Sequence, residues 1–395
     1  MASDTIPILD LSWADDPTLK PKLLQQLQSA LFDVGFLYIK NHGVDSSTIS
    51  ALTDRLPALF NLREEERAAM SKLNSPHFLG YSGFAEETTL GKQDLREQFD
   101  MGTELSVVWR DPSHVVGHNV DGSGNVGSER DFAKMYWRLR GPNQWPSEES
   151  VAGFREAFTA YHDAVQDLSY RFVHLIEEAF GIPVGTFDHF FGRDLLPSKD
   201  PSTNGTSNSP QAHTFLPPQH RIKLLKYPPS PATPESKQGV GAHKDSSGWL
   251  TFLYQVSSLP GLEVLSSSNT WIPAHPIPDT FVVNFGNAFE AATEGAVKAT
   301  THRVIAPGPD AETRYSVPFF QGLPLDMTVS EVRGYIPEHV RRMRGSVSGV
   351  ESEAQSFLDS RWDSLGESQL RKWVRSHRDV AEKWYGREVL EYYTS

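Results

Sequence analysis

The sequence predicts an α+β protein with a mainly β core, a sandwich or jelly roll, and with helices before and after that core. Between Arg221 and Leu325, short segments rich in β-branched and aromatic residues alternate with Pro, Gly and Ser, which is typical of closely spaced strands. On both sides of this stretch, apolar residues recur every three or four positions, as they do on one face of a helix. We find no internal repeat of fixed period, so a solenoid or propeller is excluded.

The first half of the chain is predicted to be mainly helical. A helix begins near Pro21 and leads into the strand-like segment GFLYIK, and a second helix, kinked by Pro57, covers Ile49 to Leu59. The clearest helix runs from Val151 to Phe180 and ends at Gly181. Because its apolar residues form one continuous stripe, this helix must lie against a large, flat surface.

These patterns divide the chain into four stretches of one integrated unit. Residues 1–196 form the N-terminal, mainly helical region, with strands that pack on the core, and residues 197–219 form a polar, exposed insertion loop. Residues 220–326 form the β core, with the strand-like segments IKLLKY, GWLTFLYQV, LEVLS, FVVNFG, THRVIA and TRYSVPFF. Residues 327–395 return to helix, and a helical pair packs on the core through Leu370, Trp373, Val374, Val380 and Trp384.

Charge and composition exclude several classes of protein. The chain has 50 acidic and 37 basic residues and a net charge of −13, which disfavours nucleic acid and anionic membrane surfaces as partners. Cysteine is absent, so a metal ion must be held by His, Asp or Glu. The segment MASDTIPILDLSW lacks the basic and apolar regions of a signal peptide. We therefore expect a cytoplasmic protein that binds a small molecule, and nothing in the sequence indicates an obligate protein partner.

The most informative motif is Gly241-Ala242-His243-Lys244-Asp245. If this segment is extended, residues two apart point to the same face, so His243 and Asp245 converge while Lys244 faces away. His302, in the strand-like segment THRVI, is the third candidate ligand. Two imidazoles and one carboxylate form a facial triad, which suits Fe(II) and leaves positions open for dioxygen and a chelating cosubstrate. A single H-x-D tripeptide also arises by chance, so this interpretation needs further support.

Further support comes from Arg314-Tyr315-Ser316, which follows His302 along the chain. On a strand, Arg314 and Ser316 share one face, and a guanidinium with a hydroxyl is suited to binding a carboxylate. The alternative is that Arg314 forms a surface ion pair, as most arginines do. The other histidines are expected to be structural or solvated, and His220, beside the polar insertion, is expected to be solvated.

Over most of its length, the chain resembles the Fe(II)/2-oxoglutarate-dependent dioxygenases of the isopenicillin N synthase-like family. IPILDLS, GFLYIKNHGV, LFNLREEERAAM and GYSGFAEETTLGKQDLREQFDM resemble successive landmarks of its N-terminal region. RIKLLKYPPSP, GAHKDSSGWLTFLYQ, the stretch from LPGLEVL to THRV, and RYSVPFF match its catalytic core in order. Several independent motifs in the correct order make the resemblance specific.

The resemblance implies a double-stranded β-helix, with Fe(II) bound by His243, Asp245 and His302. It also implies that Arg314 and Ser316 hold the distal carboxylate of the cosubstrate 2-oxoglutarate, assisted by Tyr227. The implied reaction consumes O2 and hydroxylates or desaturates a small organic molecule, with release of succinate and CO2, in specialised metabolism.

Two departures from the family pattern concern the cosubstrate pocket. Leu225 stands where the family often has Asn, and Asn287 stands where it has Asp. Some family members also keep the R-x-S pair without using 2-oxoglutarate. Aromatic side chains suit a mainly apolar substrate, and each of those expected around it could equally belong to the core. The residues expected around the substrate are Tyr81, Phe84, Phe99, Phe319 and Phe320.

Two other functions remain open at this stage. The first is an iron oxidase, or an ethylene-forming type of enzyme that breaks down 2-oxoglutarate itself. The second is a non-catalytic protein of the same fold that binds a small molecule. The segment GSGNVG at 122–127 fits the dinucleotide-binding pattern, but no apolar strand precedes it, and we interpret it as a loop.

Overall fold

Two facing sheets form the centre of the computed structural model, which describes residues 5–89, 91–114, 130–192, 215–230, 238–245, 248–343 and 364–394. The proposed insertion falls largely outside these ranges, and the segment at 122–127 lies outside them entirely. Among the described residues, the large sheet has eight strands, in the order β1 (Ile8–Asp10), β2 (Phe36–Lys40), β12 (Thr280–Phe285), β9 (Leu250–Gln255), β14 (Arg314–Gln321), β7 (Arg221–Tyr227), β6 (Glu97–Gly102) and β3 (Gly80–Ser82).

A smaller sheet faces the large one. Its strand order among the described residues is β11 (Trp271–Pro273), β10 (Leu262–Leu265), β13 (His302–Ile305) and β8 (Gln238–His243). Apolar side chains of both sheets, such as Leu225, Val240 and Val304, pack in one cluster between them. A short hairpin, β4 (Thr88–Thr89) and β5 (Lys92–Gln93), contacts β8.

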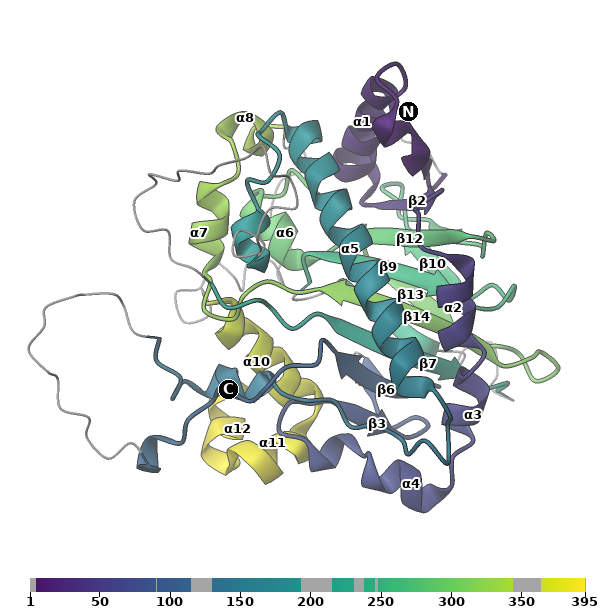
Figure 1. The fold of residues 1–395 in the computed structure, drawn as a ribbon, viewed down its shortest axis with the longest axis vertical. Coiled ribbons are helices and arrows are strands. Elements are labelled where there is room, and N and C mark those ends of the chain that lie inside the picture. The colour runs from purple at the N-terminus through teal and green to yellow at the C-terminus, as the bar shows by residue number, and fades with distance from the viewer. Residues whose placement is uncertain are drawn as a thin grey trace, which may run out of the picture.

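Helix α5 (Phe154–Phe180) lies across the outer face of the large sheet (Figure 1). Its stripe of apolar residues is buried, and Phe172 packs edge to face on Phe252 of β9 with ring centroids 5.7 Å apart. Gly181, with φ 70°, ends the helix in the left-handed conformation that glycine adopts at low cost. The predicted helix and the flat surface beneath it are both present.

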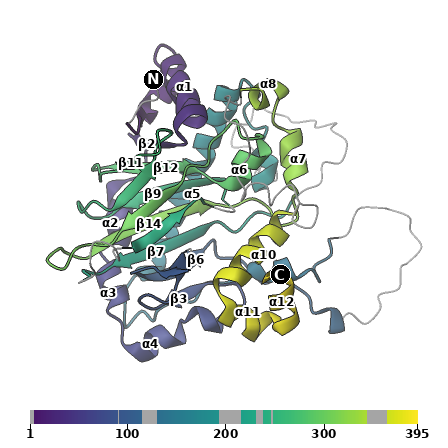
Figure 2. The same ribbon diagram turned by 180° about the vertical axis from the view of Figure 1, so that it is seen from behind.

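The remaining helices surround the two sheets. Helices α10 and α11 and their partner α12 lie beside the β6 and β3 end of the large sheet in both ribbon views (Figure 2). In the described part of the chain, no helix is both long and apolar enough to cross a membrane. The bounds are α1 (Lys20–Ser29), α2 (Ser46–Thr53), α3 (Leu56–Phe60), α4 (Glu64–Ala69), α6 (Asn287–Ala292), α7 (Val329–Gly334), α8 (Glu338–Arg341), α10 (Leu365–Ser376), α11 (Arg378–Tyr385) and α12 (Arg387–Thr394).

Three local expectations were wrong. The kinked helix at 49–59 is two helices, α2 and α3, because Pro57 sits in the first turn of α3, where its missing N–H costs nothing. The C-terminal pair is three helices, since Gly386, with φ 88°, separates α11 from α12. His220 is buried, and its ring bonds the Tyr170 hydroxyl and accepts from the Gly322 amide.

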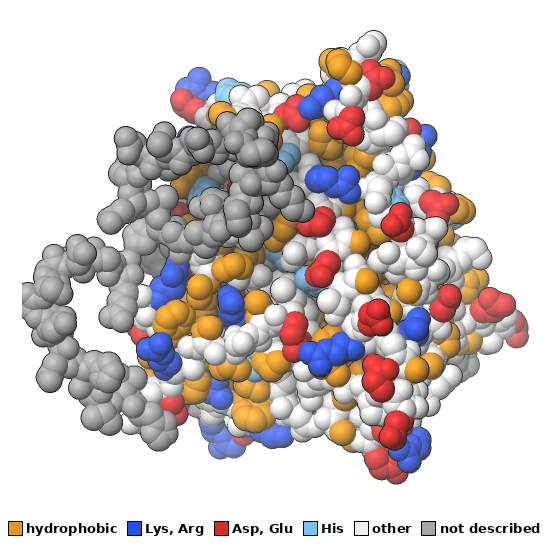
Figure 3. All heavy atoms as spheres, viewed as in Figure 1, with side chains coloured by type: hydrophobic (Ala, Val, Ile, Leu, Met, Phe, Trp, Pro, Cys, Tyr) orange, Lys and Arg blue, Asp and Glu red, His pale blue; other side chains and the backbone are white. Residues whose placement is uncertain are grey.

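Acidic and basic side chains are interspersed on the face that carries α5 (Figure 3). Many of the charged residues form opposite-charge pairs, such as Lys20 with Glu178 on α5 at 2.7 Å. The net negative charge is therefore not gathered into one patch on the visible part of this face. This face offers no charge pattern that points to a partner.

Candidate active site

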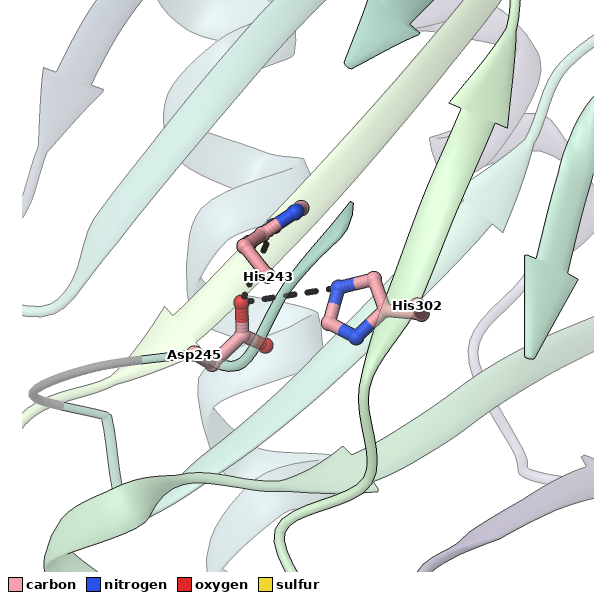
Figure 4. Close-up of side chains that lie close together, drawn as sticks. All are labelled: His243, Asp245 and His302. Atoms are coloured by element: carbon pink, nitrogen blue, oxygen red, sulfur yellow. Dashed lines mark ion pairs between the residues drawn. The ribbon is translucent and has the colours of Figure 1, made fainter. Parts of the chain in front are cut away.

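Two histidines and one aspartate meet at the end of the small sheet. His302 in β13 pairs directly opposite His243, the last residue of β8, and their ring centroids are 4.3 Å apart. Figure 4 shows the Asp245 carboxylate beside both imidazoles. Its Oδ1 lies 3.9 Å from Nε2 of His243 and 3.7 Å from Nε2 of His302. The candidate ligand atoms all lie within 4.8 Å of one another, so one ion can contact all three residues.

Backbone hydrogen bonds determine which nitrogen of each imidazole is available. Nδ1 of His243 is 2.8 Å from the Gly241 carbonyl oxygen, and Nδ1 of His302 is 3.1 Å from that of Thr300. Because a carbonyl can only accept, each Nδ1 carries the proton and each Nε2 keeps its lone pair. Metal-binding histidines typically show this arrangement. Burial and the neighbouring imidazole lower the pKa of His243 to about 3, so its ring stays neutral at neutral pH.

The Asp245 carboxylate is oriented by two residues that pair across the large sheet. Thr251 of β9 and Asn284 of β12 are directly opposite one another, and each donates to Oδ2 of Asp245 at 2.6 Å. Burial opposes ionisation of Asp245, but the two imidazoles and these hydrogen bonds outweigh it and lower its pKa. The other oxygen, Oδ1, is left facing the histidines.

A close backbone contact holds the segment that carries Asp245. A Cβ at Gly286 would lie 1.9 Å from the carbonyl oxygen of Gly248, so no larger residue fits without movement. Immediately after it, the amide of Asn287 donates to the backbone oxygen of Asp245 at 2.7 Å. The first turn of α6 therefore anchors the backbone of the candidate ligand.

Arg314 lies at the start of β14 with only 1% of its surface exposed. Its Nη2 donates to Oε1 of Gln255 at 3.1 Å, while Nε and Nη1 have no hydrogen-bond partner among the described residues. Tyr227 pairs opposite it on β7, and the Tyr227 hydroxyl interacts with the guanidinium. Ser316, two residues along β14, shares the same cavity-facing side. A buried guanidinium with unpaired N–H groups is costly, so this arrangement fits a carboxylate ligand.

These two groups of residues line one cavity of about 780 Å³. The volume is in the range of ligand pockets and exceeds the need of a five-carbon diacid alone. One part of its wall is apolar and includes Phe36, Leu225, Val240, Leu253 and Val304. A second part carries the charged side chains of Glu87, Arg96, Lys223 and Lys372, with His377 beside them.

Of the aromatic residues expected around a substrate, Phe320 lines the cavity and the other four lie outside its described lining. Phe319 precedes it on β14 and therefore points to the opposite face, toward His220 and α5. Phe99 is buried in the core, Tyr81 donates to Glu97 at 2.8 Å, and Phe84 is exposed. Of the five residues expected around a substrate, Phe320 therefore stays a candidate for contact with it.

The charged wall is the part of the site that sequence reasoning missed. Glu87 and Arg96 fall within the stretch GYSGFAEETTLGKQDLREQFDM, but their mutual ion pair at 2.9 Å depends on how that stretch folds. Lys372 reaches the same cavity from the distant C-terminal helix α10. No short sequence motif connects these residues. The one available signal was the helical spacing of the basic residues near Lys372 in the sequence.

Known proteins match the chain over nearly its whole length. Residues 6–148 match the family described as non-haem dioxygenase in morphine synthesis, N-terminal, and residues 218–322 match the 2OG-Fe(II) oxygenase superfamily. The 2-oxoglutarate-dependent dioxygenase frbJ of Dothideomycetidae sp. is 37% identical over 97% of this chain and 93% of that protein. The chain belongs to the Fe(II)/2-oxoglutarate-dependent dioxygenases of the isopenicillin N synthase-like family. The dioxygenase therefore uses Fe(II), 2-oxoglutarate and O2, and it is an oxidoreductase.

Two further comparisons concern a curated relative and the fold. Homoarginine-6-hydroxylase 2-ODD-233 of Oryza sativa subsp. japonica is 30% identical over 89% of this chain and 94% of its own length. The crystal structure of a full-length Neurospora crassa protein in complex with alpha-KG has a TM-score of 0.63 and 22% identity, covering 91% of this chain and 99% of that one. This structural similarity supports the expected double-stranded β-helix.

Proposed function

We propose that the dioxygenase hydroxylates or desaturates a small organic molecule, with His243, Asp245 and His302 as its iron ligands. The observation that carries the proposal is the convergence of two imidazoles and one carboxylate at the end of the cavity. This donor set is the one that non-haem Fe(II) oxygenases use. The similarity to the rice relative, a homoarginine-6-hydroxylase, supports hydroxylation.

Arg314 and Ser316 are proposed to hold the distal carboxylate of 2-oxoglutarate. The unpaired Nε and Nη1 of Arg314 support this role, because a carboxylate can accept from both. The hydroxyl of Tyr227 interacts with the same guanidinium and is proposed to assist. The departure at Leu225 places an apolar side chain in the cavity lining, where the family often has an amide.

The bound Fe(II) would activate O2 for oxidation of a C–H bond, with conversion of 2-oxoglutarate to succinate and CO2. The protein residues position the reactants for this step and limit the access of water. Thr251 and Asn284 fix the direction of the Asp245 carboxylate. The apolar side chains of Phe36, Val240 and others keep part of the cavity dry.

The test combines iron binding with coupled turnover. The purified protein is loaded anaerobically with Fe(II) and 2-oxoglutarate, examined for the weak visible charge-transfer band, and then screened in air for substrates that stimulate succinate release. His302→Ala should abolish iron binding and turnover, whereas His275→Ala, at an exposed position outside the cavity lining, should preserve both.

Two results would contradict the proposal. Iron binding and turnover retained by His302→Ala would exclude the metal role of that imidazole. Release of ethylene in the absence of any added substrate would show that 2-oxoglutarate itself is the molecule broken down.

A further inference from the structure

Helix α10 presents a basic face to the cavity. The opposite side of the helix is buried, and its Leu370 and Val374 belong to the same apolar cluster as Tyr136 and Trp137. The packed side fixes the rotation of α10 about its axis and therefore fixes which residues reach the cavity. The polar residues of α10 that line the cavity are Ser368, Arg371, Lys372, Arg375 and Ser376, at the spacing of one helix face.

The other charged groups on this side of the cavity belong to a balanced network. Glu87 lies 2.8 Å from Lys72 and 2.9 Å from Arg96, and Asp100 lies 2.6 Å from Lys72 and 3.5 Å from Lys223. Within the described residues, this network contains three carboxylates and three cations. The carboxylates are those of Glu87, Asp94 and Asp100, and the cations are Lys72, Arg96 and Lys223.

His377 does not alter this balance. Its Nε2 lies 2.7 Å from Oε1 of Glu87, and burial together with Lys72 lowers its pKa, which keeps the imidazole neutral. The network is therefore internally compensated and does not require a charged ligand.

Lys372 and Arg375 remain outside this balance. Neither makes an ion pair with a described residue, although both line the cavity. Both side chains are exposed. The surrounding protein and the nearby Lys223 lower the pKa of Lys372 to about 8, against the opposing effect of the Asp245, Asp100 and Glu87 carboxylates, so the amine is still mostly protonated at neutral pH. Within the described residues, Lys372 and Arg375 on the cavity wall therefore have no counter-charge in direct contact.

The loaded metal centre does not supply that counter-charge. The two positive charges of Fe(II) and the one of Arg314 are matched by the 2-oxoglutarate dianion and the Asp245 carboxylate, so the centre is neutral as a whole. We propose that Lys372, together with Arg375, binds an oxyanion of the molecule to be oxidised, a carboxylate or a phosphonate, and so selects acidic substrates. This inference rests on the proposed function, since it assigns a substrate class to the same cavity.

The test uses the anaerobic protein loaded with Fe(II) and 2-oxoglutarate. The probes form three sets, and each set presents one skeleton as an acid, a phosphonate and an amide. The benzyl set is phenylacetate, benzylphosphonate and phenylacetamide. The other two sets carry the same three groups on an indolyl-methyl and on a pentyl skeleton. Binding is followed by the change in the charge-transfer band. Lys372→Gln is compared with Lys383→Gln, a matched change at an exposed position of α11 outside the cavity lining.

We expect at least one oxyanion to bind tenfold or more tightly than its amide, and we expect Lys372→Gln, but not Lys383→Gln, to reduce that preference below about twofold. Whether the acid or the phosphonate binds more tightly identifies the anion that the site prefers. Equal binding of oxyanions and amides in every set, or a preference retained by Lys372→Gln, would overturn the inference.

Two other outcomes separate the competing explanations. If Lys372→Gln weakened the binding of 2-oxoglutarate as much as the binding of the acid probe, Lys372 would be assigned to the cosubstrate. That result would overturn this inference and leave the proposed function intact. Absence of the charge-transfer band in the unaltered protein would overturn the proposed function and, with it, this inference.

Discussion

Replacement of Arg314 by Met should remove the binding of 2-oxoglutarate without harming the fold. Met fills much of the space of the arginine side chain, and it removes a buried charge whose Nε and Nη1 have no partner among the described residues. Loss of one member of a buried, hydrogen-bonded charge pair costs about 2–5 kcal/mol, which corresponds to roughly thirty-fold to several thousand-fold weaker binding.

The magnitude can be measured as ligand-dependent stability. At a 2-oxoglutarate concentration 100 times the Kd, a ligand that binds only the folded state stabilises it by about 2.7 kcal/mol. A thirty-fold weaker Kd reduces this gain to below about 1 kcal/mol. Thermal unfolding of the Fe(II)-loaded protein with and without 2-oxoglutarate, together with anaerobic titration of the charge-transfer band, gives both values.

The same experiment distinguishes a binding role from a structural one. In the absence of 2-oxoglutarate, Arg314→Met should be at least as stable as the unaltered protein, because replacing a buried charge by an apolar group of similar size is often neutral or stabilising. The control is Arg303→Met, which removes a partly exposed guanidinium paired with Glu263 at 2.7 Å. An unchanged affinity in Arg314→Met, or an equal loss in the control, would refute the reasoning.

Three further changes test the support of the site and of the core beneath α5. Asn284→Ala removes the 2.6 Å hydrogen bond to Asp245 and should weaken iron binding by about 10–100-fold, measured with a competing chelator; full affinity would exclude an orienting role. Gly286→Ala creates the contact with Gly248 and should lower the free energy of unfolding by about 1–3 kcal/mol in urea, whereas Gly334→Ala, in open space, should not destabilise. Burial lowers the pKa of His220 to about 3, below the ordinary value of about 6.5, so the unfolded chain takes up the proton first and stability falls as the pH drops below about 6.5, by up to about 1.4 kcal/mol per pH unit. His220→Gln should make that dependence shallower, and an identical pH profile would contradict it.

The strands of the β core could be predicted because local patterns determine them. IKLLKY and TRYSVPFF were predicted as strands because they are short β-rich segments between turn residues, and they form β7 and β14. The structure adds that these two strands pair directly. Strand β6, in the segment EQFDMG, was missed, since its buried Glu97 and Asp100 owe their burial to distant cations. A propensity scan cannot anticipate such tertiary compensation.

The histidine that sequence reasoning misplaced shows the same limit. His220 follows a polar segment, and its local sequence indicates exposure. Its burial depends on Tyr170 of α5, which lies far from it in the chain and bonds its ring at 2.8 Å. The apolar stripe predicted that α5 covers a flat surface, but it did not predict which other segment would be buried beneath the helix.

The candidate metal ligands were predictable for a different reason. His243 and Asp245 are close in sequence, His302 lies in a strand-like segment, and the resemblance implied a metal role for all three, so no knowledge of the tertiary structure was needed to name them. The structure adds how the two imidazoles are oriented. Cross-strand pairing brings the rings side by side, and the Gly241 and Thr300 carbonyl oxygens select their tautomers. The division into regions at 196, 219 and 326 stays a prediction.

The position of the basic residues on α10 could be read from the sequence, but their place at the cavity could not. The apolar residues Leu370, Trp373 and Val374 indicated packing on the core, and no function was predicted for the basic residues beside them. The structure turns these basic residues toward the cavity, because the buried face of α10 belongs to the apolar cluster that contains Tyr136 and Trp137. Lys372 therefore reaches the cavity as a consequence of where the opposite face of its helix is buried, and a substitution that rotated α10 would change substrate binding without touching Lys372.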